Sequence, residues 1–152
     1  MYEKTVTIFN YYEDKTGEAY WYPHVLPDVD LNHDRGAILK EYGPESTDNA
    51  ELHIRVTMMN GQEYVSDNNH TMVPWLPPKK WKKQTDDLLA ESITFSPDCF
   101  FWEGEWAEGM VRDSDYRNGF YQHMNSNHDN VFKITSVGGP YTLIPHFEIL
   151  GK

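Results

Sequence analysis

The chain has 152 residues, a formal net charge of −11 at pH 7 and an aromatic content of 14%. This length is enough for one domain with a sizeable hydrophobic core. The acidic balance argues against a nucleic-acid backbone as the main partner, because phosphate binding requires clustered Lys and Arg. The one cysteine, Cys99, excludes an intrachain disulfide and a thiolate metal cluster.

The N-terminal residues show no basic start followed by an apolar run, so no signal peptide is expected. No window approaches the ~20 apolar residues of a membrane span. We therefore expect a soluble protein that is made in the cytoplasm and has no membrane partner.

The first half of the chain is predicted to form short strands. Lys4–Tyr12 is the first, and Ala19–Leu26 returns after a loop that contains Gly17. Residues 27–49 hold acidic turns and isolated glycines, and they are expected to form an irregular insertion or long loop. Within them, the run 37–42 fits either a strand or one helical turn.

Ala50–Met58 shows the clearest strand alternation, and Asn60-Gly61 then predicts a tight hairpin turn into Gln62–Val65. One face of Ala50–Met58 is apolar and carries Leu52, Ile54, Val56 and Met58. The proline-rich segment Val73–Trp81 is expected to be extended and stiff, with a short helix beginning at Pro78 and Trp81 packed inward. The pattern thus predicts a sheet followed by an extended connection.

In the last third, residues 93–104 predict a strand, a turn at Ser96-Pro97-Asp98 and another strand. Asp113–Met124 is the one good helix. Val131–Val137 and 141–150 predict a terminal hairpin around a Gly138-Gly139-Pro140 turn. Together these elements predict an all-β fold with one short helix. We expect one β-barrel-like domain over residues 1–152, a small barrel or sandwich of about seven short strands.

Candidate metal ligands lie close together early in the chain. Five of them fall within eleven residues: His24, Asp28, Asp30, His33 and Asp34. Their spacing matches no metal-binding motif, so turn acids and a surface histidine are the favoured interpretation. The sequence therefore predicts no metal and no cofactor.

No catalytic motif is apparent either. His123, His128 and His146 fit an acid–base pair if the fold brings them together, although interface histidines are commoner. His146 is interpreted as one position of a structural strand. The apolar and acidic neighbours of Cys99 are expected to raise its thiol pKa and make it a poor nucleophile. We therefore expect a protein that is not an enzyme.

The candidate interaction surface is the basic cluster of an otherwise acidic chain. It comprises Trp75, Lys79, Lys80, Trp81, Lys82 and Lys83. Charge complementarity suits it to an acidic neighbour such as a second copy of this protein, and a solvated helix start is the plainer alternative. The five tryptophans also leave open a carbohydrate- or ligand-binding β-sandwich.

Several stretches in chain order resemble a family of prophage-encoded proteins from Firmicutes bacteriophages, found among head and neck genes. These stretches are 7–12, 21–23, 75–81, 94–98, 104–105, 131–137 and 145–152. The terminal strands also resemble phage head–tail joining proteins, the head-closure or stopper proteins. Residues 27–49 and the helix near Tyr116 have no counterpart in that second group.

The resemblance implies a structural role in a virion, at the neck between head and tail, without catalysis. Such proteins are small β-barrels that assemble as rings, usually six-fold, beneath the portal and connector. Partners implied in this way are further copies of the chain, the portal or connector proteins and the tail-completion proteins. Packaged DNA would lie close by without tight binding.

Overall fold

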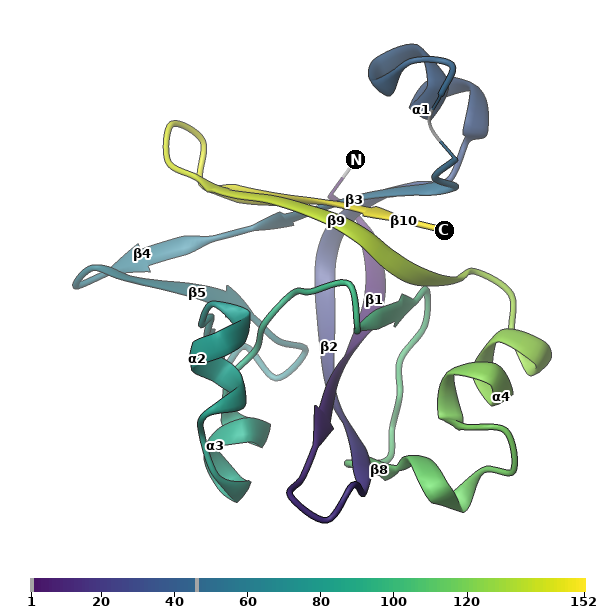
Figure 1. The fold of residues 1–152 in the computed structure, drawn as a ribbon. Helices are drawn as coiled ribbons and strands as arrows, with labels where there is room; N and C mark the ends of the chain where they lie inside the picture. The colour runs from purple at the N-terminus through teal and green to yellow at the C-terminus, as the bar shows by residue number, and fades with distance from the viewer. Residues whose placement is uncertain (1, 46) are drawn as a thin grey trace.

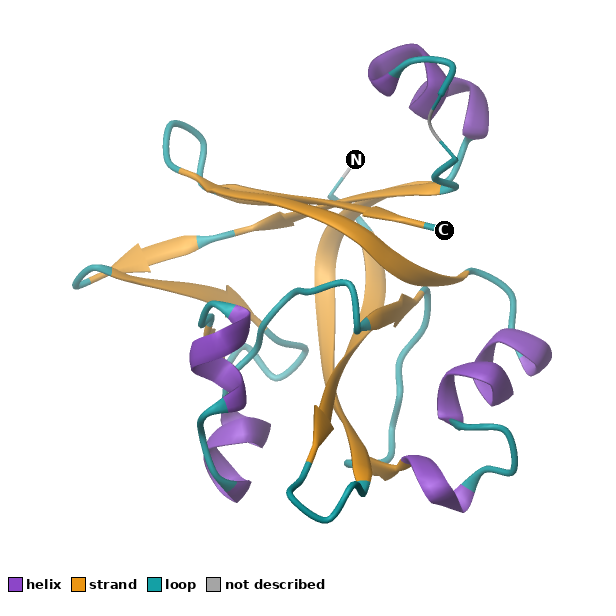
Figure 2. Ribbon diagram, in the orientation of Figure 1, coloured by secondary structure: helices purple, strands orange, loops and turns teal. Residues whose placement is uncertain are grey.

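The computed structural model describes residues 2–45 and 47–152. Strands account for 44% of the chain and helices for 19%, which confirms the predicted β class (Figures 1 and 2). The strands are β1 (Lys4–Glu13), β2 (Ala19–Asn32), β3 (Ala50–Arg55), β4 (Thr57–Met59), β5 (Gln62–Ser66), β6 (Met72–Pro74), β7 (Phe100–Trp102), β8 (Val111–Arg112), β9 (Val131–Tyr141) and β10 (His146–Gly151). The α-helices are α1 (Arg35–Tyr42), α2 (Pro78–Lys82), α3 (Asp86–Glu91) and α4 (Phe120–Asn127).

The main sheet has seven strands in the order β1-β7-β9-β10-β3-β2-β8, and β1 also pairs with β2. The long strands β2 and β9 take part in two layers. β2 pairs with β1 as far as Val29 and with β3 from Asp30 onward. β9 pairs with β7 near its start and with β10 farther along. The result is a sandwich-like arrangement in which shared strands form the corners.

A second, three-stranded sheet has the order β4-β5-β6. Its β4–β5 hairpin extends away from the main layers in Figure 1, on the same side of the view as the loop between β9 and β10. The turn at Asn60-Gly61 is present as predicted, with φ of 51° and 77° at the two residues. This small sheet therefore forms an arm on the sandwich.

The core consists of two clusters. The first lies between the layers and includes Leu52 and Ile54 of β3 and Phe147 and Ile149 of β10. The second gathers aromatic residues beneath α4, with Phe120 and Met124 of that helix packed on Phe9, Trp21, Phe100 and Val131. The apolar face predicted for Ala50–Met58 is buried through Val56, whereas Met58 is 45% exposed because the chain leaves the main sheet there.

Residues 27–49 are more regular than predicted. The first six continue β2, with Asp28 at a positive φ of 56° where the register of β1 and β2 shifts. Residues 35–42 form α1, capped by the Asp34 carboxylate, which accepts a hydrogen bond from the Gly36 amide. Pro23 and Pro27 both lie inside β2, which runs past Leu26, the predicted end of this strand.

The predicted fold has one short helix, with a second, shorter one at Pro78, whereas the described chain contains four α-helices. The predicted helix Asp113–Met124 is instead a 3₁₀ turn at Asp113–Asp115 followed by α4. Gly119, at φ 88°, separates the two because this backbone conformation interrupts a helix. The short helix predicted at Pro78 is present as α2, and its Trp81 points inward.

The terminal hairpin is present, but its turn was misplaced. β9 runs through residues 138–140 to Tyr141, and the turn occupies 142–145. Between the pairs Tyr141–His146 and Gly138–Glu148, two residues of β9 lie opposite one residue of β10, which is a bulge. Gly139 adopts φ 105° within it. The glycines thus accommodate an extra residue within the strand and do not reverse the chain.

Candidate functional site

The predicted interface cluster divides into buried and exposed members. Trp81 is completely buried, packs edge-on against Tyr12 and Tyr22, and donates its indole N–H to the Ser92 carbonyl at 3.2 Å. Trp81 was expected to contact a partner, but it anchors α2 to the β1–β2 hairpin. The Trp81 ring therefore has no exposed surface with which to contact another molecule.

The lysines of the cluster do lie at the surface. Lys79, Lys80, Lys82 and Lys83 are all exposed on or just after α2. Lys82 forms an ion pair with Asp98, which ties α2 to the segment before β7. The predicted basic surface is therefore present. The one aromatic residue of α2, Trp81, is buried and does not contribute to it.

Trp75 is half-buried and packs on Phe147, with ring centroids 5.0 Å apart. Its indole nitrogen is buried and has no hydrogen-bond partner among the described residues. The remaining three tryptophans belong to the second core cluster, Trp21 buried and Trp102 and Trp106 half-buried. Sugar binding through a row of exposed indole rings is not supported by these positions.

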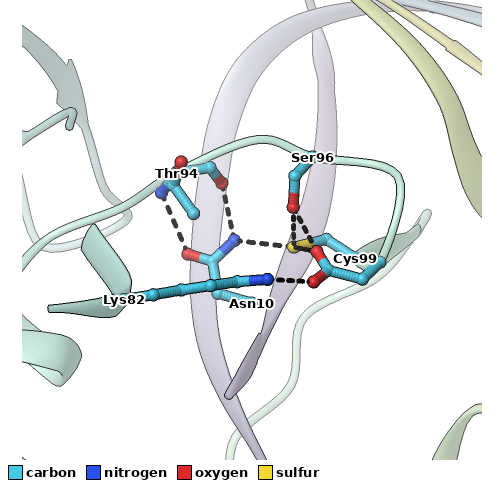
Figure 3. Close-up of polar contacts among 6 residues, drawn as sticks. Asn10, Lys82, Thr94, Ser96 and Cys99 are labelled. Carbon is cyan, nitrogen blue, oxygen red and sulfur yellow. Dashed lines mark hydrogen bonds and ion pairs between the residues drawn. The ribbon is translucent and has the colours of Figure 1, made fainter. Parts of the chain in front are cut away.

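The segment that α2 contacts is held by a polar network around Asn10 (Figure 3). The Asn10 amide donates to the Thr94 carbonyl at 2.6 Å, and its oxygen accepts from the Thr94 N–H at 3.2 Å. Cys99 lies at the end of this network, within 3.5 Å of the Asn10 amide nitrogen. Burial raises the pKa of the Cys99 thiol, as the sequence predicts, so the cysteine is a core residue.

The histidines and acids singled out in the sequence lie apart. His24 is buried, whereas His33 is exposed and 3.6 Å from Glu103. His123 packs on Tyr116, and His128 packs on Trp102. Among the described residues, the 24–34 set therefore forms no group that could hold a metal ion, and the three later histidines pack on different neighbours.

A different polar cluster lies on the outer face of β3 and β10. Glu51 and His53 alternate on β3, and His146 and Glu148 alternate on β10. Glu148 stands directly opposite His53 in the antiparallel register. The His53 and His146 rings stack with centroids 5.6 Å apart and planes 19° from parallel. Sequence reasoning missed this cluster, although the repeated pairing of a carboxylate and a histidine two residues apart was a signal for it.

Acidic groups surround these histidines. A hollow of about 280 Å³ beside them is lined by Asp30, Asn32, Glu41, Glu51 and His53. A hydrogen bond to the buried Glu51 raises the pKa of Glu41, which lies on α1. The Ile144 carbonyl at 2.5 Å and then the Glu148 carboxylate raise the pKa of His146, against the opposing effect of burial.

Four exposed apolar side chains lie on the two projecting hairpins, while Leu88 of α3 and Met110 before β8 are exposed elsewhere. Leu143 is 95% and Ile144 is 72% exposed in the β9–β10 turn, and Met58 and Met59 are 45% and 41% exposed in β4. The amide of Val56 donates to the Pro145 carbonyl at 3.0 Å, so the turn adjoins the start of β4. We call these four residues the apolar tips.

The β4 strand adds an open sheet edge to the apolar tips. It pairs with β5 alone among the described residues, so its outer backbone groups are not used in the sheet. Exposed sheet edges and apolar residues are typical of surfaces that bind another chain. No helix among the described residues is long and apolar enough to cross a membrane.

Comparison with known protein families assigns the whole chain to one family. It belongs to a family of unknown function, DUF6751, whose pattern matches residues 1–152. Comparison with curated proteins gave no match, and comparison with solved structures gave none. The surfaces described above are therefore the basis for a functional proposal.

Proposed function

We propose that this chain is a structural subunit of a tailed bacteriophage or prophage, forming a head–tail joining ring that links the portal or connector to the tail. The main observation behind the proposal is the exposure of the four apolar tips, above all Leu143 and Ile144, which are 95% and 72% exposed. Isolated apolar residues are ordinary on protein surfaces, but here four project on two adjacent hairpins. Such a surface is suited to burial against another chain.

A ring requires two different surfaces on each subunit, because each copy contacts the next in a head-to-tail manner. The apolar tips and the open edge of β4 provide one of them. The exposed lysines of α2 lie elsewhere on the acidic chain and suit an acidic partner surface. The apolar tips support self-assembly, the lysines offer a second surface for an acidic neighbour, and the sequence resemblance to phage neck proteins supports a place in a virion.

The acidic charge fits a ring around packaged DNA. A net charge of −11 repels phosphates, so a channel lined by such subunits lets DNA pass without binding it tightly. The proposed localisation is the virion neck after synthesis in the host cytoplasm. In this role the protein acts through contacts between subunits and performs no reaction.

Replacing Leu143 and Ile144 together by Asp tests the self-assembly. Sedimentation velocity over a wide concentration range, followed by negative-stain imaging, should show wild-type rings, with a six-fold ring expected. The Asp variant should sediment as a monomer with unchanged circular dichroism, because the exposed turn contributes little to the fold.

A double substitution elsewhere on the surface provides the control. Gln122→Asp with Asn125→Asp adds the same two negative charges at exposed positions away from the tips, and it should leave the rings intact. A wild-type protein that remains monomeric at every concentration would contradict ring formation through the apolar tips. Equal loss of rings in the control would show that overall charge, and not the apolar tips, controls assembly.

A further inference from the structure

The polar cluster on the outer face of β3 and β10 contains histidine and glutamate side chains that the proposed assembly does not involve. Successive residues two apart on a strand share a face of the sheet. Glu51 and His53 therefore point the same way as His146 and Glu148, which the register brings alongside them. Two imidazoles and two carboxylates thus project from the same face of two paired strands. Paired strands hold side chains more rigidly than a loop does.

The potential ligand atoms are close enough for one ion. One ring nitrogen each of His53 and His146 and a carboxylate oxygen of Glu148 all lie within 4.8 Å of one another. Ligands bound to zinc at about 2.0–2.2 Å in a tetrahedron stand roughly 3.4 Å apart. Small rotations of these partly exposed side chains bring the three atoms to that spacing.

The groups around the three ligands favour a cation. The Glu51 carboxylate lies 2.6 Å from Nε2 of His53 and is itself buried. Asp30 stands opposite His53 on β2, which adds a third carboxylate to the same face. The nearest positive side chain in the register, Arg55, has its guanidinium 4.2 Å above the Tyr2 ring.

The hydrogen bonds also orient the ligands. Nδ1 of His146 lies 2.5 Å from the Ile144 carbonyl. A neutral imidazole that donates its Nδ1 proton to a carbonyl presents the lone pair of Nε2 to a metal, the usual arrangement of metal-binding histidines. On His146 this Nε2 faces Glu148, at 3.1 Å.

We propose that His53, His146 and Glu148 bind a divalent transition-metal ion of the zinc type, with Glu51 as a fourth ligand or as a partner of His53. Two imidazoles and one or two carboxylates suit zinc and its neighbours, whereas magnesium and calcium prefer all-oxygen sites. Because its ligands come from both strands, the ion joins β3 to β10 and stabilises the sheet next to the apolar tips.

Isothermal titration of the untagged, chelator-treated protein with zinc chloride tests the site. We expect one tight site per chain, and no comparable heat with magnesium chloride. His53→Gln and His146→Gln should each abolish it, and Glu51→Gln should weaken binding by about 10- to 100-fold. His123→Gln and His128→Gln, at exposed histidines outside the cluster, should leave it unchanged.

A second measurement on the unaltered chain makes the result independent of variant folding. Zinc should protect His53 and His146, but not His123 and His128, from acylation by diethyl pyrocarbonate as read by peptide mass spectrometry. Equal modification of all four with and without zinc would overturn the site. So would zinc binding that survives in the His53→Gln, His146→Gln double variant.

Discussion

The burial of His24 in β2 makes the fold sensitive to acid. Burial disfavours the imidazolium and lowers the pKa of His24 from 6.5 to about 4, with smaller opposing effects from the Ser92 backbone and the Asp67 charge. Between these two values the unfolded chain binds a proton that the folded chain does not. The contribution to stability is therefore fully present above pH 6.5 and is lost as pH falls toward 4.

Urea unfolding at pH 7.5, 5.5 and 4.5 measures this effect. Since one pKa unit corresponds to about 1.4 kcal/mol, the gap from 6.5 to about 4 amounts to about 3 kcal/mol. His24→Leu should remove most of this pH dependence, because the buried site no longer titrates. His123→Leu, at an exposed histidine, should retain it. Identical pH profiles for wild type and His24→Leu would contradict this account.

At the scale of the element, α2 depends on one side chain. It has five residues and no side-chain N-cap hydrogen bond. Helices this short are not stable alone in water, so tertiary packing must hold them. Trp81 provides that packing through Tyr12, Tyr22 and the Ser92 carbonyl.

Trp81→Ala should therefore lower the free energy of unfolding by about 3–5 kcal/mol, as expected for truncation of a fully buried indole. Lys79→Ala together with Lys80→Ala should change it by less than about 0.5 kcal/mol per site, because both side chains are exposed. Urea denaturation monitored by circular dichroism measures both. A loss below about 1 kcal/mol for Trp81→Ala would show that α2 is held by other contacts.

Strand alternation predicted much of the sheet, since burial on one face imposes a period of two. Leu52 and Ile54 are buried as that pattern requires, and Lys4–Tyr12 differs from β1 by one residue. Turns were harder to place, because glycine at positive φ serves both turns and bulges. Gly139 illustrates this: it lies in a bulge of β9, and the reversal comes at 142–145.

The spacing of a carboxylate and a histidine two residues apart marks each half of the polar cluster in the sequence, but not that the two halves meet. Its two halves lie on strands far apart in the chain, and only the register of β3 and β10 places Glu148 opposite His53. Spacing along the sequence contains no information on that register. Trp81 was placed in the interaction cluster and was also expected to pack inward, and only the inward packing is confirmed.

At the scale of the whole molecule, two hairpins project from a sandwich-like body (Figure 1). They carry four of its exposed apolar residues, including Leu143 and Ile144, the two most exposed. The body is closed by two core clusters, and its surface is strongly acidic. This division between a packed body and projecting contacts is the physical basis for proposing an assembly subunit.

Quantitative mass spectrometry of gradient-purified phage particles, released from a host that carries the gene, tests the central claim most directly. A structural ring subunit must co-purify with tailed particles at a fixed copy number, near six per particle for one six-fold ring. The account predicts that value, and it predicts loss of tails when Leu143 and Ile144 are replaced by Asp. Tailed particles that lack the chain, with all of it left in the free protein fraction, would contradict the account.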